Sequence, residues 1–501
     1  MRENKSKKDN NETSEFSITK RSEDYSQWYL DVISAGKLAD NSPVRGCMVI
    51  RPNGYAVWEK MQKILDEMFK ETGVANAYFP LFIPISFLNK EAKHVAGFAK
   101  ECAVVTHHRL ELDTKGRLQP TAELEEPLIV RPTSETIMYD TFSKWINSHR
   151  DLPLLINQWA NIVRWEMRTR PFLRTMEFLW QEGHTAHATK EEADTRTEQM
   201  IAVYKKFCEE YLAIPVIAGL KTESEKFAGA VYTTCIEAMM QDGKSLQTGT
   251  SHMLGQNFAK AFEVKYLDQK GESQYVWQTS WGLSTRLIGA LIMVHSDDKG
   301  LVLPPRLAPT PVVIVPIWSS LEEKEKVLVA AHKISNLVSS KLGLNVKVDD
   351  RDLRPGPKFY EWEKMGIPLR LELGPKDLAN NSLMAVRRDN EVKEEVNQTN
   401  IIDYVSRALE DIQDSLFKKA LKFQKNNTKK TDSWDEFKKL VTDDGGFILA
   451  HWCGSAKCEQ QIKEATKATI ACIPFDQKKE TGKCILCGKK SEGRVIFAKA
   501  Y

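Results

Sequence analysis

The chain has 501 residues, of which 42% are hydrophobic and 28% are charged, and its 71 Lys+Arg against 68 Asp+Glu leave a formal net charge of +3. This length accommodates about three domains, and the composition excludes a collagen, a coiled coil and a wholly disordered chain. The near-neutral charge also excludes a protein that coats nucleic acid through its net charge alone, although one domain can still carry a basic patch.

The N-terminal residues and the apolar segments give no sign of export or of a membrane span. Residues 1–15 are almost entirely polar, and we expect them to form a disordered tail. The first 25 residues contain no apolar segment, so no secretory signal is predicted. Long apolar stretches such as residues 311–318 are only about a strand in length, against the roughly 20 residues that a spanning helix needs. We therefore expect a cytoplasmic protein.

A helix and a proline-interrupted strand come next in the chain. Apolar residues recur at helical spacing over residues 55–70, which predicts an amphipathic helix. Residues 75–85 then have the pattern of a buried strand that contains Pro80 and Pro84. Because proline has no N–H to donate to a ladder, we expect this strand at a sheet edge or an interface.

Further strand-like segments follow, and several are joined by short connections. They are residues 127–131, 160–166, 176–182, 261–267 and 274–280. This arrangement favours an antiparallel sheet with helices packed on it.

The pattern changes at the proline-rich residues 304–311, which we interpret as a hinge. Strand and helix then alternate, which predicts a small α/β domain with a largely parallel sheet. The expected elements are a strand at 311–317, a helix at 321–342, a strand at 344–349, a helix at 358–365, strands at 368–373 and 382–388, and a long helix at 399–424. Residues 417–501 hold 18 Lys+Arg against 10 Asp+Glu, so the last region is basic while the rest is slightly acidic.

An arginine-rich segment is the first candidate for a functional site. Arg164 and Glu166 end one strand, and residues 168–174 connect it to the next. A guanidinium can hold phosphate oxygens bidentately, and a carboxylate can hold an amine. The alternative is a solvated basic hairpin in which the glutamates pair with the arginines.

Several segments together resemble the prolyl-tRNA synthetase family of class IIa aminoacyl-tRNA synthetases, and within it the eukaryotic and archaeal-type branch. RWE at 164–166 with RPFLRTMEFLWQEGHTAH at 170–187 resembles motif 2, and SWGLSTRLIGALI at 280–292 resembles motif 3. The helix and strand at 55–84 resemble motif 1, and residues 131–136 and 247–258 complete the set. The resemblance runs from about residue 20 to residue 501.

The resemblance implies an α+β fold of three domains after the tail. These are a class II synthetase catalytic domain at 16–305, with an antiparallel sheet flanked by helices, an α/β anticodon-binding domain at 306–410 and a C-terminal zinc-binding α+β domain at 411–501. It further implies a homodimer formed through the motif 1 region, with tRNA(Pro), L-proline and ATP as partners. The implied reaction attaches proline to the 3′ end of tRNA(Pro) in two steps, through prolyl-adenylate.

The same resemblance assigns residues to ATP. Catalytic roles fall to Arg164, Glu166 and Arg286, because the charge that develops on the α-phosphate needs fixed cations. The implied ATP-binding set is Arg164, Glu166, Arg174, Thr175, Phe178, Gln247, Thr250, Ser284 and Arg286, with Phe178 and Arg286 on the two faces of the adenine. Position 284 is commonly Thr in the family, and Ser keeps the hydroxyl. Chemistry of this kind uses Mg²⁺, for which Glu166 is a suitable partner.

For proline, the resemblance implies a small apolar pocket that contains a buried carboxylate. The implied proline-binding set is Thr133, Glu135, Arg164, Trp180, Glu182, His184 and His252, with Thr133 and Glu135 at the secondary ammonium. His184 and His252 could instead be core histidines that are satisfied by hydrogen bonds.

Two further expectations concern fidelity and anticodon recognition. About 60 residues separate His184 from Gln247, too few for the long editing insertion of many bacterial-type relatives, so we expect no editing in cis. Arg351, Arg354 and Lys358 lie in a loop that also carries aromatic residues, and this mixture suits single-stranded RNA. Alternatively, Phe359 and Trp362 form the core face of a helix.

Five of the nine cysteines lie between residues 453 and 487. Four of them form two pairs, Cys453 with Cys458 and Cys484 with Cys487, and four thiolates suit a closed structural Zn²⁺ site. The family carries a similar zinc-binding tail. Unligated reduced thiols are the alternative, and Cys472 reads as a separate buried thiol.

Two rival functions remain open. One is another class IIa synthetase, which the pocket set from Thr133 to His252 disfavours. The other is an inactive paralogue that only binds tRNA. Such proteins typically lose the ATP arginines, and Arg164 and Arg286 are both present.

Overall fold

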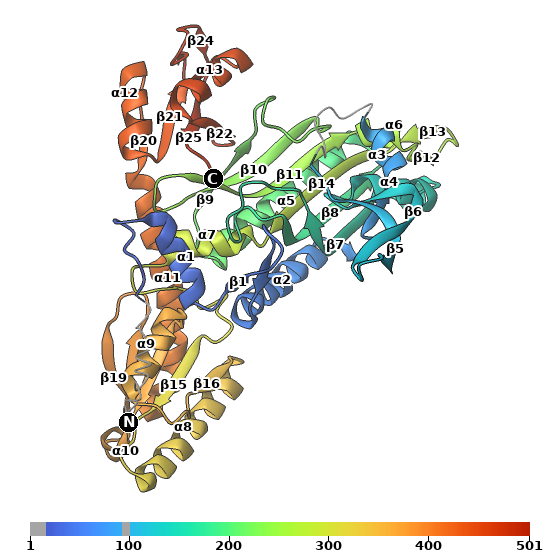
Figure 1. Cartoon of the computed structure of the whole chain (residues 1–501). Helices are drawn as coiled ribbons and strands as arrows, with labels where there is room; N and C mark the ends of the chain where they lie inside the picture. The colour runs from blue at the N-terminus through green and yellow to red at the C-terminus, as the bar shows by residue number, and fades with distance from the viewer. Residues whose placement is uncertain (1–16, 93–100) are drawn as a thin grey trace, which may run out of the picture.

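The computed structural model describes residues 17–92 and 101–501, and it is built around one large sheet (Figure 1). This sheet has eleven strands in the order β20-β21-β25-β22-β9-β10-β11-β14-β8-β7-β3. The strands of its catalytic half are β3 (Ala75–Asn76), β7 (Leu154–Val163), β8 (Glu177–His187), β9 (Val216–Leu220), β10 (Tyr232–Met239), β11 (Ser245–Gly255) and β14 (Trp277–Ser284). All neighbours in this half are antiparallel except β3 and β7, so the predicted antiparallel sheet is confirmed.

Four helices cover one face of the catalytic half. They are α1 (Tyr25–Ala35), α2 (Pro52–Glu71), α5 (Lys190–Glu210) and α7 (Arg286–His295). Their apolar sides form the largest core cluster together with Trp281 and Leu283 of β14. Along β8 and β14, side chains alternate between this core and the opposite face. The opposite face is therefore free to carry a site.

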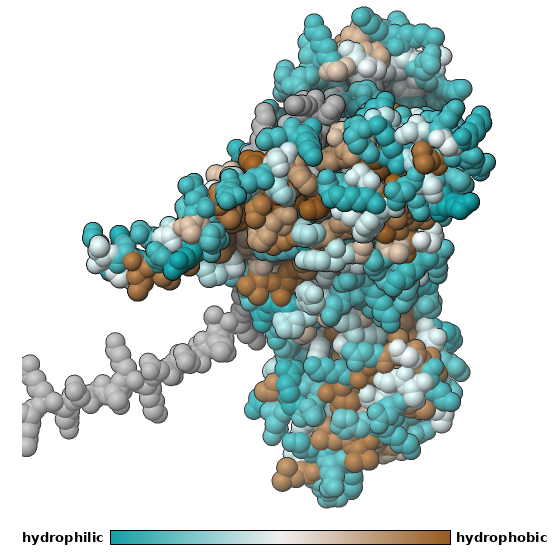
Figure 2. Space-filling view, turned by 90° about the vertical axis from the view of Figure 1, so that its right-hand side faces the viewer, coloured by the Kyte–Doolittle hydropathy of each residue, from teal (hydrophilic) through white to brown (hydrophobic). Residues whose placement is uncertain are grey.

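A second, smaller sheet stands beside the main one, in the order β4-β6-β5. Its strands are β4 (Phe82–Pro84), β5 (Val104–Leu112) and β6 (Leu118–Val130). The surface in Figure 2 shows hydrophobic side chains on a projecting arm and around its base. The exposed apolar residues of this small sheet include Phe82, Val104, Leu110, Leu112 and Leu118.

The expected strand over residues 75–85 is split in two. Its first part is β3, at the edge of the main sheet, and its last part is β4, at the edge of the small sheet. Pro80 lies between them and Pro84 ends β4, so the predicted edge position is confirmed. The remaining short elements of this region are β1 (Ala39–Asn41), β2 (Met48–Ile50), α3 (Ile85–Ala92), α4 (Glu135–Trp145), the 3₁₀ turn His149–Asp151, α6 (Asn257–Ala261), β12 (Lys265–Leu267) and β13 (Ser273–Tyr275).

The next domain has a five-stranded sheet in the order β16-β15-β17-β18-β19. Its elements are β15 (Val312–Pro316), α8 (Leu321–Leu342), β16 (Val346–Val348), α9 (Pro355–Lys364), β17 (Leu369–Leu373), α10 (Pro375–Ala379), β18 (Ser382–Arg387), β19 (Lys393–Asn397) and α11 (Ile401–Asn426). Only β16, β15 and β17 are parallel, so the expectation of a largely parallel sheet is wrong: β18 is antiparallel to β17, and β19, which was not predicted, is antiparallel to β18. The link through α10 between β17 and β18 is too short for a crossover connection, so β18 runs antiparallel to β17.

The C-terminal region completes the large sheet. Its elements are β20 (Thr428–Lys430), α12 (Trp434–Lys439), the π-helical turn Leu440–Asp444, β21 (Phe447–His451), α13 (Ala456–Thr466), β22 (Thr469–Pro474), β23 (Gly482–Lys483), β24 (Lys490–Ser491) and β25 (Arg494–Ala498). Strand β22 pairs with β9 through Ile473 opposite Leu220, which joins the two regions into one sheet. Helix α11 runs across the expected boundary at residues 410 and 411.

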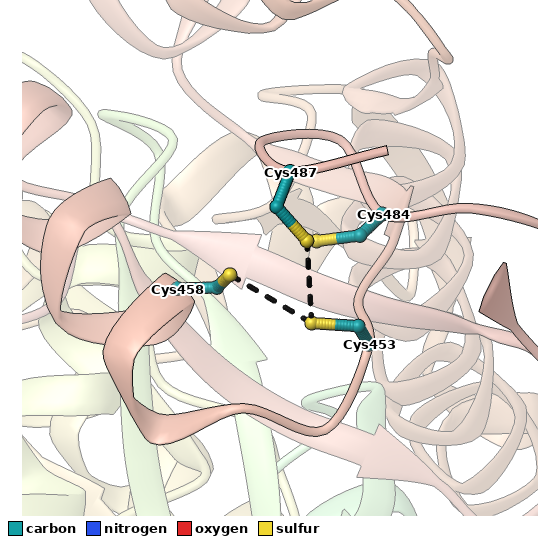
Figure 3. Close-up of side chains that lie close together, drawn as sticks. All are labelled: Cys453, Cys458, Cys484 and Cys487. Atoms are coloured by element: carbon teal, nitrogen blue, oxygen red, sulfur yellow. Dashed lines mark hydrogen bonds between the residues drawn. The ribbon is translucent and has the colours of Figure 1, made fainter. Parts of the chain in front are cut away.

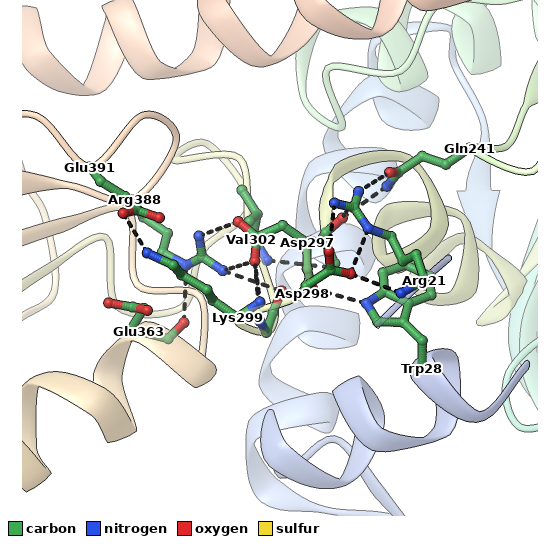
Figure 4. A network of polar contacts seen from close by, with 12 residues as sticks. Arg21, Trp28, Gln241, Asp297, Asp298, Lys299, Val302, Glu363, Arg388 and Glu391 are labelled. Carbon is green, nitrogen blue, oxygen red and sulfur yellow. Dashed lines mark hydrogen bonds and ion pairs between the residues drawn. The ribbon is translucent and has the colours of Figure 1, made fainter. Parts of the chain in front are cut away.

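A network of polar contacts connects the second domain to the first (Figure 4). Arg388 donates to both carboxylate oxygens of Asp297, at 2.7 and 2.6 Å. It also donates to the carbonyl of Glu363 at 3.0 Å. On the other side, the Trp28 indole donates to the Asp297 carbonyl at 2.9 Å, and Arg21 binds the neighbouring Asp298. Residue 297 therefore connects α1 to the second domain.

No helix among the described residues is long and apolar enough to cross a membrane.

Candidate active site

A cavity of about 730 Å³ opens on the face of the main sheet that the four helices leave free. It is lined by side chains of β8, β11 and β14, by the arginine-rich loop, and by residues at the start of α4 and α7. All fifteen residues expected for ATP and proline lie in its wall: Thr133, Glu135, Arg164, Glu166, Arg174, Thr175, Phe178, Trp180, Glu182, His184, Gln247, Thr250, His252, Ser284 and Arg286. Segments more than 150 positions apart in the sequence are thus brought together.

Strand register explains how three strands fill one wall. His184 lies opposite Ser280, which in turn lies opposite His252, so these three side chains form one row across the sheet. Glu182 and Thr250 both lie opposite Gly282 and form the next row. The residues between them face the helices. At Gly183, an added Cβ would lie 2.0 Å from the Trp281 ring, so only glycine fits there.

Two buried carboxylates and a histidine form the polar end of the cavity. His184 Nε2 lies 3.2 Å from Glu182 Oε2, and Tyr139 Oη lies 3.1 Å from His184 Nδ1. Glu182 also accepts from the Ser134 hydroxyl and from Gln158 Nε2, the latter at 2.9 Å. Glu135 accepts a hydrogen bond from the Thr133 hydroxyl.

These contacts set the charges at this end of the cavity. Burial alone would raise the pKa of Glu182, but its hydrogen bond with His184 and the charge of that ring lower it overall. Burial alone would lower the pKa of His184, and Glu182 and Glu135 raise it instead. For Glu135, burial dominates and raises the pKa, with a contribution from Glu182. Glu182 and His184 thus form an ion pair, and Glu135 is the carboxyl whose charge most needs a cationic ligand.

His252 differs from His184. Burial, with the nearby charge of His184, lowers the pKa of His252 to about 3, so it is neutral at pH 7. Its Nδ1 lies 2.9 Å from the Thr233 hydroxyl, and its ring packs on Phe227 at 4.6 Å between centroids. Both histidines are hydrogen-bonded, as the core-histidine alternative requires, and both also line the cavity.

Arginines line the other end of the cavity. The Arg164 guanidinium lies over the rings of Phe178 and Trp180, at 5.6 and 5.4 Å, and donates to the Pro132 carbonyl at 3.0 Å. Arg174 is paired with Glu166 at 2.6 Å, as the basic-hairpin alternative expected. Burial lowers the pKa of Arg286, and the charge of Arg164 contributes to this.

Several polar atoms of this wall have no partner among the described residues. The hydroxyls of Thr175 and Ser280 and the indole N–H of Trp180 are buried and unbonded. Buried polar groups are normally paired, so these three are available to a bound ligand. Ser280 was not predicted, although its even spacing from Ser284 along a strand could have indicated it. Phe227 and Thr233 were also missed, because nothing in the sequence relates their segment to the pocket.

The four predicted cysteines converge in the C-terminal region (Figure 3). Their sulfur atoms all lie within 4.8 Å of one another, and Cys453 Sγ lies 3.7 Å from both Cys458 Sγ and Cys487 Sγ. Ligands about 2.3 Å from a tetrahedral zinc ion are about 3.8 Å apart, so the spacing fits this metal. A backbone N–H from Lys489 helps to lower the pKa of Cys487 to about 7. Cys472 is buried outside this cluster.

The three residues expected at the anticodon differ in availability. Arg354 is exposed just before α9. Arg351 is paired with Asp349 and Glu361, both at 2.6 Å. Lys358 is buried and donates to the Asp349 carbonyl at 2.9 Å, so it does not present its charge to RNA in this conformation. Trp362 is also buried, in agreement with the alternative of a helix core face.

Comparison with known proteins identifies the family. Residues 117–295 match the tRNA synthetase class II core domain (G, H, P, S and T), residues 311–408 match the anticodon binding domain, and residues 434–501 match the prolyl-tRNA synthetase C-terminal family. A proline–tRNA ligase from Porphyromonas gingivalis is 59% identical over 488 residues, which cover 97% of this chain and 99% of the relative. The chain belongs to the prolyl-tRNA synthetase family.

Other relatives support the same assignment. Proline–tRNA ligases from Christiangramia forsetii and Cytophaga hutchinsonii are 57% and 56% identical, each over 97% of this chain and 99% of the relative. These organisms are bacteria, so the relatives do not support the eukaryotic and archaeal-type branch predicted from sequence. The segment between His184 and Gln247 is filled by the end of β8, α5, β9 and β10, and it contains no editing domain.

Proposed function

We propose that the cavity binds proline and ATP side by side and joins them as prolyl-adenylate. As a class II proline–tRNA ligase, the chain then attaches the proline to the 3′ end of tRNA(Pro), with release of pyrophosphate and AMP. The observation that carries the residue assignment is the buried group of Glu135, Glu182 and His184 beside the Arg164 guanidinium.

Proline would occupy the end of the cavity formed by β8 and β11. Its secondary ammonium would bind Glu135 and Thr133, and the ion pair of Glu182 with His184 would hold the floor of the pocket. Trp180 and His252 would enclose the ring. A proline-sized pocket discriminates weakly against the smaller alanine, and the described residues contain no editing domain, so we expect some mischarging.

ATP would occupy the arginine-lined end. Arg164 would bind the α-phosphate and the proline carboxylate together, and it would stabilise the charge that develops as the carboxylate attacks. Arg174 with Thr175 would bind the other phosphates, and Phe178 and Arg286 would enclose the adenine. Gln247, Thr250 and Ser284 would complete this half. ATP carries Mg²⁺ in such reactions, and Glu166 is the carboxylate that we place beside it.

The test is ATP–pyrophosphate exchange against a panel of amino acids. We expect exchange with proline and none with threonine, serine or glycine. Glu135→Ala is expected to lower proline-dependent exchange at least 100-fold, because it removes the partner of a buried cation. ATP binding, measured separately, should stay within twofold.

Glu198→Ala is the matched control for this substitution, since Glu198 is an exposed glutamate on α5. It should exchange like the unaltered chain. Normal proline turnover in Glu135→Ala would show that the ammonium site lies elsewhere, and a chain with no exchange for any amino acid would support the inactive paralogue.

The other assignments are proposals on separate grounds. The sulfur spacing supports a structural zinc ion at Cys453, Cys458, Cys484 and Cys487. The exposed apolar residues of the β4–β6 sheet, next to motif 1, support a homodimer. Arg354 and Arg351 remain the candidates for anticodon contact, and Lys358 would have to leave its buried position to join them.

We also propose the domain limits 16–305, 306–410 and 411–501 after the tail at 1–15, which itself lies outside the described residues. The extent of the matched families supports the two inner limits. The lack of an editing insertion between His184 and Gln247 supports the domain arrangement of the eukaryotic and archaeal-type branch. Separately, the use of tRNA as a substrate supports a cytoplasmic location.

A further inference from the structure

A loop of the catalytic domain, residues 221–231, closes one side of the cavity. Its Glu225 and Phe227 line the cavity wall. The backbone N–H of Phe227 donates to the Thr233 hydroxyl at 2.9 Å, and that hydroxyl contacts His252 at 2.9 Å. Because Phe227 also packs on the His252 ring, the position of this loop determines the shape of the proline end of the cavity.

The C-terminal domain holds this loop at three successive points. Lys221 donates to the Ala471 carbonyl of β22 at 2.7 Å. Glu459 of α13 accepts from the Thr222 hydroxyl at 2.7 Å and also from the Ser224 hydroxyl. Lys463, one turn further along α13, pairs with Glu225 at 3.1 Å.

The central contact is built as a buried site. Glu459 is 5% exposed and Thr222 is 2% exposed. A carboxylate that is shielded in this way needs its hydrogen-bond donors, and both of the hydroxyl donors come from the loop. Glu459 also directly follows Cys458, so the cysteine cluster and the loop are attached to the same first turn of α13.

We propose that α13 positions loop 221–231 over the proline end of the cavity, through Glu459 and Lys463. These two are positioning residues that touch neither substrate. The C-terminal domain would then contribute to proline affinity without lining the pocket, and the proposal rests on the assignment of that pocket to proline.

The test compares Michaelis constants in ATP–pyrophosphate exchange. Glu459→Ala should raise the KM for proline about tenfold, because the loop loses two charge-assisted hydrogen bonds. The KM for ATP and kcat should stay within twofold, and the metal content should not change. Amide hydrogen exchange of residues 221–231 should become faster. Lys463→Ala, which removes a partly exposed pair, should raise the KM for proline only two- to threefold.

Glu464→Ala is the matched control, since Glu464 is exposed on the same helix and contacts Gln460 instead. Its KM for proline should equal that of the unaltered chain. The KM of Glu459→Gln should lie between those of the unaltered chain and Glu459→Ala. An unchanged KM for proline in Glu459→Ala would overturn the proposal, as would an equal loss for proline and ATP. If Glu135→Ala loses proline-dependent exchange while Glu459→Ala does not, only the positioning role is wrong. If Glu135→Ala keeps it, the pocket assignment is wrong.

Discussion

At the scale of single residues, the opposed pKa shifts of Glu182 and His184 make the ion pair sensitive to pH. His184 has a pKa above its ordinary 6.5 in the folded chain, so its stabilising share is complete below pH 6.5 and is lost as the pH rises through the folded value. Glu182 has a pKa below its ordinary 4.5, so its share is complete above pH 4.5 and is lost as the pH falls through the folded value. Both shares are complete only between these limits.

We therefore expect His184→Ala to destabilise the catalytic domain most between pH 4.5 and 6.5, and less as the pH rises. Removal of one partner of a buried pair costs about 3–5 kcal/mol. Thermal unfolding of both chains across the pH range measures the difference. His332→Ala, which alters an exposed histidine on α8, serves as the control. A gap that stays constant from pH 5 to 9 would rule out the charged pair.

The sequence predicted many of the residues that line the cavity, but it did not predict which side chains they contact. The resemblance named Arg164 and Phe178 for different parts of the ligand, whereas in this structure they contact each other. Lys358 was expected at the surface and is buried, because its ammonium binds a backbone carbonyl that no local pattern indicates. Contacts of this kind depend on long-range packing, which a single sequence does not specify.

At the scale of elements, the cysteine cluster joins a loop before α13, its first turn, and the β23–β24 hairpin. The pair spacings were sufficient to predict this convergence, because few arrangements bring two such pairs together except around a metal. The direction of strands was harder to predict. Strand β18 follows a strand and a short helix, as it would in a parallel unit, and only the short α10 link indicates that it runs antiparallel to β17.

We expect Cys484→Ser to lower bound zinc from about one ion per chain to well below that, as measured by elemental analysis. Because metal binding and local folding are coupled, hydrogen exchange should rise first in residues 434–501. A chelator should likewise raise hydrogen exchange first in residues 434–501. Cys47→Ser, in the catalytic domain, should keep its zinc; a full zinc content in Cys484→Ser would refute the site.

At the scale of the whole molecule, Arg388 and Asp297 fix the second domain on the first. The Arg388 side chain is 4% exposed and that of Asp297 is 29% exposed, so the pair is half-buried, and Arg388 has further backbone acceptors. The proline-rich residues 304–311 were predicted to form a hinge, but no sequence pattern indicates the pairing of Arg388 with Asp297, which lie 91 positions apart.

Arg388→Ala should therefore loosen the two domains relative to each other. We expect aminoacylation of tRNA to fall several-fold, because it needs the anticodon domain and the catalytic centre at a fixed distance, while ATP–pyrophosphate exchange stays within twofold. Small-angle scattering should report a larger radius of gyration. Lys341→Ala, an exposed cation on α8, is the control. Equal losses in both assays would instead indicate damage to the catalytic domain.

The pairing of β22 with β9 has a consequence for any shortened form of this chain. Strand β9 is an interior strand only because the last domain supplies its neighbour. Without that domain, β9 would present a row of unpaired backbone groups, which is a template for association between chains. Removal of the C-terminal region would thus turn an interior strand of the sheet into an exposed edge strand, and the truncated chain would be prone to aggregate.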